Sequence, residues 1–135
     1  MPTPSRWMIR CSFIYLLIGF LMGGLLLIGK AFPSYYFQWF LLPVHIEVVL
    51  FGWIIQFTLG TAYWILPRFL EGPPRGDIIW GKLMVLSLNL GIFLTVLSYL
   101  RLLPNFGTLI GRIFETASVA LFIYLHWNRI VTYRN

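Results

Sequence analysis

One histidine inside a long apolar segment has the clearest capacity for chemistry in this chain. His45 lies two residues after Pro43, at the start of an apolar run from Val44 to Leu66. A helix over these 23 residues is about 34 Å long at ~1.5 Å per residue, enough to cross a hydrocarbon core of about 30 Å. Pro43 suits a helix start and Pro67 suits a stop. An ionisable side chain inside a membrane span is costly and usually has a partner or a ligand.

Small and polar residues continue along one side of this predicted helix. Steps of three, four and seven residues place a set of six on a shared face. The set is His45, Val49, Gly52, Gln56, Gly60 and Tyr63. Gly52 and Gly60 are expected to leave a shallow groove below the imidazole. The alternative is that both glycines only allow a second helix to pack closely.

The groove and the single histidine favour a haem over a metal ion held by side chains alone. No second histidine, cysteine or carboxylate shares the face of His45, and Glu47 is expected to point elsewhere. A haem needs one axial ligand from a helix and room for a flat apolar ring. We therefore predict His45 as a ligand of haem iron, with Gly52 and Gly60 beside the ring. The alternative is a hydrogen bond from His45 to another helix.

Charged residues in the last predicted span allow two interpretations. Arg112 and Glu115 are three residues apart, so they can pair on one helix face and reduce the cost of burial. Arg112 could also join Arg101 and Lys30 in receiving haem propionates at the same end of the bundle.

The remaining polar residues are expected to serve packing. His126 precedes Trp127 and is predicted to be an interfacial side chain. Gly19 and Gly23 have the small-xxx-small spacing of closely packed helices. Interhelical hydrogen bonds are expected from Ser87, Asn89, Thr95 and Ser98.

Composition defines the class of protein. The chain has 135 residues, of which 59% are hydrophobic and 10% charged, which predicts a single integral membrane domain, 1–135. The lone Cys11 excludes an internal disulfide and a multi-cysteine metal site. The net charge of +6 is spread over helix ends, so nucleic-acid binding is not expected.

Four apolar runs predict an all-α, four-helix transmembrane bundle. The expected spans are about 12–29, 44–66, 80–100 and 107–127. Lys30–Leu42 is rich in aromatic residues and is expected to lie along the lipid–water boundary. Pro67–Ile79 and the segment around Pro104 are expected to be turns.

The basic residues predict the orientation. With the amino terminus in the cytoplasm, that side holds seven Lys and Arg residues and the opposite side three. The seven are Arg6, Arg10, Arg68, Arg75, Lys82, Arg129 and Arg134. This bias favours cytoplasmic positions for both termini.

The run Leu-Pro-Val-His-Ile-Glu-Val-Val-Leu-Phe-Gly-Trp, closing with Gly-Thr-Ala-Tyr-Trp-Ile-Leu-Pro-Arg, resembles the second transmembrane helix of haem–copper oxidase subunit I. The closest branch is that of cytochrome cbb3 and nitric oxide reductase. In that family the early histidine of this helix is an axial ligand of the low-spin haem, and His45 occupies its position. The resemblance covers four helices of twelve or more, and it implies a prokaryotic inner membrane.

The chain departs from that family in its later ligands. The family's copper site, its catalytic haem and the second axial ligand of its low-spin haem use histidines on later helices, which this chain lacks. The resemblance therefore implies no copper and no complete oxidase. The expected function is electron transfer through a b-type haem on His45, with the sixth ligand from another membrane subunit or a second copy of the chain. The alternatives are a cofactor-free structural or assembly subunit and, with less support, a transporter.

Overall fold

The structure is a computed structural model that describes residues 1–32, 34, 39–67 and 77–131. Its helices are α1 (Thr3–Ala31), α2 (Leu42–Glu47), the π-helix η2 (Val48–Ile55), α3 (Gln56–Ile65), α4 (Ile78–Tyr99) and α5 (Phe106–Val131). The segments α2, η2 and α3 follow one another without a break and form one rod. Counting this rod as one, the described residues contain four helices long and apolar enough to cross a membrane. The prediction of an all-helical chain with four candidate spans is confirmed.

Two of the helices extend beyond the predicted spans by four residues or more. The first begins at Thr3 rather than Ser12, and the last runs past Trp127 to Val131. Pro4 lies in the first turn of α1, where its missing N–H is not needed. The helix then continues through Arg6 and Arg10, which are exposed. The predicted bounds were too short because they followed the apolar residues, whereas helical hydrogen bonding continues through the charged residues that flank them.

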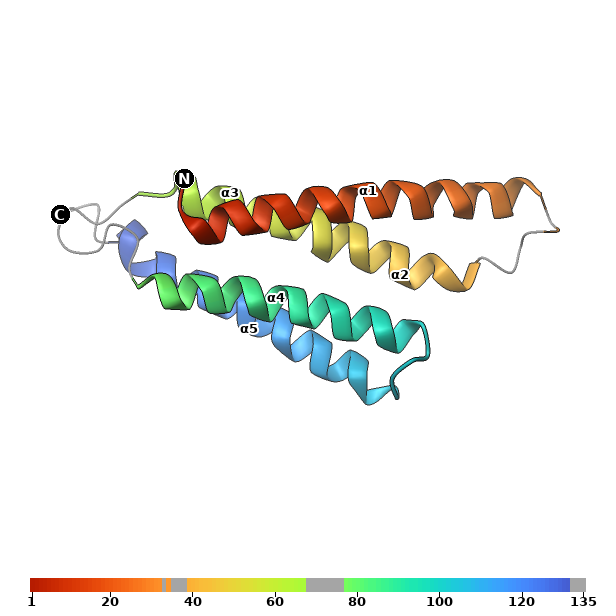
Figure 1. The fold of residues 1–135 in the computed structure, drawn as a ribbon. Helices are drawn as coiled ribbons and strands as arrows, with labels where there is room; N and C mark the ends of the chain where they lie inside the picture. The colour runs from red at the N-terminus through yellow and green to blue at the C-terminus, as the bar shows by residue number, and fades with distance from the viewer. Residues whose placement is uncertain (33, 35–38, 68–76, 132–135) are drawn as a thin grey trace.

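The helices form two antiparallel hairpins (Figure 1). The helix α1 lies along the α2–η2–α3 rod, and α4 pairs with α5. The start of α1 and the end of α5 lie at the same end of the bundle. The hairpins meet mainly through α4, which contacts α1, α2 and η2. The buried core between them consists of Met8, Tyr63, Met84, Val85, Leu88, Ile92 and Leu125.

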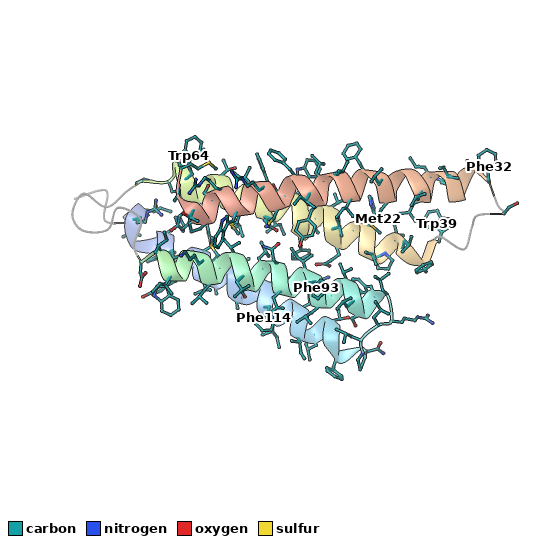
Figure 2. The ribbon with its side chains drawn as sticks, viewed as in Figure 1. Met22, Phe32, Trp39, Trp64, Phe93 and Phe114 are labelled. Atoms are coloured by element: carbon teal, nitrogen blue, oxygen red, sulfur yellow. The ribbon has the colours of Figure 1, made fainter. Side chains whose placement is uncertain are left out.

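The outer faces of the helices are apolar. Phe20 is 72% exposed and Leu27 is 68% exposed. Figure 2 shows such side chains projecting outward along the bundle, with Trp64 near one end and Phe32 and Trp39 near the other. This distribution suits a lipid environment, with aromatic side chains toward both ends.

Small residues bring α4 and α5 into close contact. A Cβ at Gly91 would lie 2.8 Å from the carbonyl oxygen of Gly111, and one at Gly111 would collide with the Thr95 hydroxyl. Ser87 donates to the Phe114 carbonyl at 2.6 Å, and the Thr108 hydroxyl donates to that of Ser98 at 2.8 Å. The Thr95 hydroxyl donates to Glu115, and the Asn89 side chain accepts from Tyr15 and Gln56. The predicted interhelical hydrogen bonds are therefore confirmed.

The connections are described in part. Residues 33 and 35–38 of Lys30–Leu42, predicted as a surface segment, lie outside the described residues, and so do residues 68–76 of Pro67–Ile79, predicted as a turn. The side chain of Asp77 caps α4 by accepting from the Ile79 N–H at 2.9 Å. The predicted turn around Pro104 is present between α4 and α5, and Arg101 takes a left-handed conformation there, with φ of 59°.

Candidate functional site

His45 lies against α1 where Gly23 leaves room for the imidazole. It belongs to α2, which begins with Leu42 and Pro43. A Cβ at Gly23 would lie 3.1 Å from Cε1 of the imidazole and 3.8 Å from both ring nitrogens. The edge of the ring therefore points at the α1 backbone. The sequence predicted Gly23 as a packing residue, and the group packed on it is the imidazole.

A groove of about 610 Å³ runs beside this contact. It lies between the second half of α1 and the rod, and no residue of α4 or α5 lines it. Its lining is apolar apart from His45, Lys30 and Trp39, and its walls and floor include Gly19, Phe20, Gly23, Gly24, Leu26, Leu27, Leu42, Val49 and Trp53. The groove is therefore an outward-facing feature of the first hairpin.

The two imidazole nitrogens of His45 have different surroundings. Nδ1 is buried and has no hydrogen-bond partner among the described residues, whereas Nε2 is not fully buried. His45 is one of the residues that line the groove. A nitrogen without a partner in an apolar environment is costly. The accessible Nε2 is the atom that could take a ligand.

The π-helix divides the predicted face of the rod into two. A π-turn closes an i→i+5 hydrogen bond, so each turn holds more residues than the 3.6 of an α-helix. His45, Val49 and Trp53, at steps of four, line the outward groove. Gly52, Gln56, Gly60 and Tyr63 are buried instead. The six residues predicted to share a face thus belong to two sides.

The predicted groove over Gly52 and Gly60 is wrong in its location. A Cβ at Gly52 would lie 2.6 Å from the ring of Tyr15, and one at Gly60 would lie 2.8 Å from Cβ of Met8. Side chains of α1 occupy the space beside both glycines. Ser5 also donates a hydrogen bond to the Gly60 carbonyl. The open space lies next to Gly24, where a Cβ would meet nothing within 4 Å.

The three cations predicted near the site are separated. Lys30 lines the groove. Arg101 is exposed in the turn between α4 and α5, and Arg112 is occupied by two carboxylates. Its Nη2 donates to Glu47 at 2.6 Å and its Nη1 to Glu115 at 2.6 Å. Lys30 is the one of the three that borders the groove.

Glu47 is the residue that sequence reasoning missed. It was expected to point elsewhere, and it points from the rod to α5, with a side chain only 2% exposed. The predicted pair of Arg112 and Glu115 is confirmed, with Glu47 as its third member. The sequence contained the signal, because a carboxylate inside a span needs a cation, and Arg112 was expected at the same end of the bundle as the proposed haem site.

The prediction of His126 as an interfacial side chain is wrong. His126 is 1% exposed. Its ring stacks on Phe122 at a centroid distance of 4.1 Å and meets Tyr63 edge-on at 5.3 Å. Its Nδ1 lies 2.7 Å from the Phe122 carbonyl oxygen. The place of His126 at the end of an apolar run predicts its depth in the bilayer, but not whether its side chain points toward lipid or toward the other helices.

Next to it, Arg129 closes the end of α3. Arg129 is 2% exposed and donates to the carbonyls of Pro67 at 2.6 Å and Leu66 at 2.8 Å. These two carbonyls follow Ile65, the last residue of α3, and take no part in its helical hydrogen bonding.

The described residues contain no group of three or more His, Cys, Asp or Glu side chains that could hold a metal ion. A haem requires fewer protein groups than such a metal site: one axial nitrogen, an apolar slot and a cation near its edge. In the groove the corresponding groups are His45, the open space beside Gly24 and Lys30. Comparisons with known protein families, curated proteins and solved structures found no match.

Proposed function

We propose that this chain is a small electron-transfer subunit of a membrane redox complex, with a b-type haem held by Nε2 of His45 in the outward groove. The observation that carries the proposal is an accessible imidazole nitrogen in an apolar groove of about 610 Å³. The orientation proposed is that of a prokaryotic inner-membrane protein with both termini in the cytoplasm, as the distribution of basic residues favours.

The chain's own residues have separate roles in this proposal. His45 would supply one ligand to the iron, and the open space beside Gly24 would let a flat ring approach α1. Lys30 offers a charge for a propionate. When bound, the haem supplies the one-electron chemistry, and the protein influences its potential through ligation and burial. The groove opens away from α4 and α5, so the sixth ligand comes from another subunit or a second copy of this chain.

A cofactor-free structural subunit is the second candidate. A histidine that ligates a metal usually donates its other ring N–H to an acceptor. Nδ1 of His45 has none among the residues that the structure describes. In this case the groove between α1 and the rod receives a helix of a neighbouring subunit, which hydrogen-bonds to the imidazole.

The α-band of the dithionite-reduced complex distinguishes the two functions. We expect His45→Ala to abolish the low-spin haem signal of this subunit, and His126→Ala, on the other hairpin, to retain it. Assembly of both variants is checked by size-exclusion chromatography. A wild-type chain in its intact complex without haem would overturn the electron-transfer function and leave the structural one.

A further inference from the structure

Two arginines near the start of α1 lack a carboxylate partner. Arg6 and Arg10 are exposed, and neither forms an ion pair with the residues that the structure describes. The described carboxylates are engaged elsewhere, because two of them bind Arg112 and that of Asp77 caps α4. Like charges four residues apart on a helix repel each other, and an anion between them removes the repulsion. The pair is therefore suited to an anion from outside the chain.

The packing of α1 fixes the direction in which both arginines point. Ser5, Met8 and Ser12 are each 0% exposed and, at steps of three and four residues, form the inner face of the helix. Ser5 also donates to a carbonyl of α3, which holds the helix in this rotation. Arg6 and Arg10 share the opposite face. The two guanidinium groups are thus presented away from the bundle by a backbone that is held in place.

The length of α1 places the pair at the depth of lipid headgroups. The 19 uncharged residues between Arg10 and Lys30 span about 28 Å at ~1.5 Å per residue, which matches a hydrocarbon core of about 30 Å. The same rise puts Arg6 about 6 Å beyond Arg10, within a headgroup layer of about 5–7 Å on each side of the core. Trp7 lies between them in the sequence, is 45% exposed and belongs to a residue type enriched at this boundary.

We propose that Arg6 and Arg10 bind the phosphate of an anionic phospholipid in the leaflet around the start of α1. Guanidinium groups bind phosphate oxygens through paired hydrogen bonds. Phosphatidylglycerol fits better than phosphatidylcholine, because its headgroup carries no cation of its own to compete with the arginines. The outer face continues below the pair, at steps of three and four residues, with Phe13 (55% exposed), Leu17 (62%) and Leu21 (63%). The acyl chains of the bound lipid lie along this apolar face.

Native mass spectrometry of the full chain, released from a neutral detergent, tests this proposal. The probes are phosphatidylglycerol and phosphatidylcholine with identical acyl chains at equal concentrations. We expect the wild type to retain phosphatidylglycerol preferentially. The double variant Arg6→Gln/Arg10→Gln should bind it about 25-fold more weakly, at roughly fivefold for each arginine near a membrane surface. The matched control, Lys82→Gln/Arg101→Gln, removes the same charge from exposed positions of the other hairpin and should keep the preference.

Three results would overturn the proposal. Equal binding of both lipids by the wild type would leave an acidic segment of a neighbouring subunit as the partner of the arginines. An equal loss of binding in the control would mean attraction by net charge alone. Displacement of the lipid by soluble glycerol phosphate at the same concentration would assign the site to a free anion. If the double variant loses its helical circular dichroism signal, the folded single variants decide, each with an expected loss of about fivefold. None of these outcomes depends on haem.

Discussion

At the scale of single residues, two adjacent glycines of α1 have different roles around His45. Gly23 gives the imidazole its place, because a Cβ there would lie 3.1 Å from the ring. Gly24, one residue on, is exposed and borders the open groove. The sequence placed His45 in a span but could not say which glycines it meets, since that depends on the pairing of two helices. Polar residues whose partner lies one turn away on the same helix, such as Arg112 and Glu115, were easier to predict.

This difference gives a stability prediction. Gly23→Leu should destabilise the fold by roughly 1–3 kcal/mol, because its side chain is forced against His45 in a packed contact. Gly24→Leu should be neutral or stabilising by up to about 1 kcal/mol, because it replaces an exposed helical glycine. Thermal unfolding in the same detergent compares the two. Equal loss of stability in both variants would contradict the contact between Gly23 and the imidazole.

At the scale of elements, η2 decides how the rod presents its residues. A uniform period of 3.6 predicted one face from His45 to Tyr63, and the wider π-turns separate the outward His45 from the buried Gly52 and Gln56. No local residue type announces a π-helix, so this division could not be read from the sequence. Helix existence was predictable because a bilayer requires every backbone group to be paired within its segment.

The contact between α1 and η2 can be tested by cross-linking. A Cβ at Gly19 would lie 3.9 Å from Cβ of Val49, within the range of about 3.5–4.5 Å found across disulfides. In a Cys11→Ser background, Gly19→Cys with Val49→Cys should form an intramolecular disulfide under mild oxidation, seen as a mobility shift that reductant reverses. The control pair, Gly24→Cys with Val49→Cys, should not. Cross-linking of the control alone would mean a different register between α1 and the rod.

At the scale of the whole molecule, two hairpins leave both ends of the described chain at one end of the bundle (Figure 1). Four apolar runs were enough to predict this arrangement, since an even number of crossings returns the chain to its starting side. The burial of His126 was not predictable in the same way. Its direction is set by the approach of Tyr63 from the other hairpin.

The side of the membrane follows from the charge bias. We expect reporter fusions at the amino and carboxyl termini both to give a cytoplasmic signal, because seven of the ten Lys and Arg residues fall at that end of the predicted bundle. A reporter active only outside the cytoplasm, fused to the α4–α5 turn near Asn105, is the complementary control. A cytoplasmic signal from one terminus and an external signal from the other would exclude four crossings.

The contact of Arg129 has a consequence for biogenesis. Its guanidinium binds the carbonyls of Leu66 and Pro67, at the end of α3, from a helix that is synthesised after α3 and α4. During membrane insertion these carbonyls therefore have no Arg129 donor until α5 has been synthesised. A chain that stops before Arg129 would leave these two carbonyls without that donor.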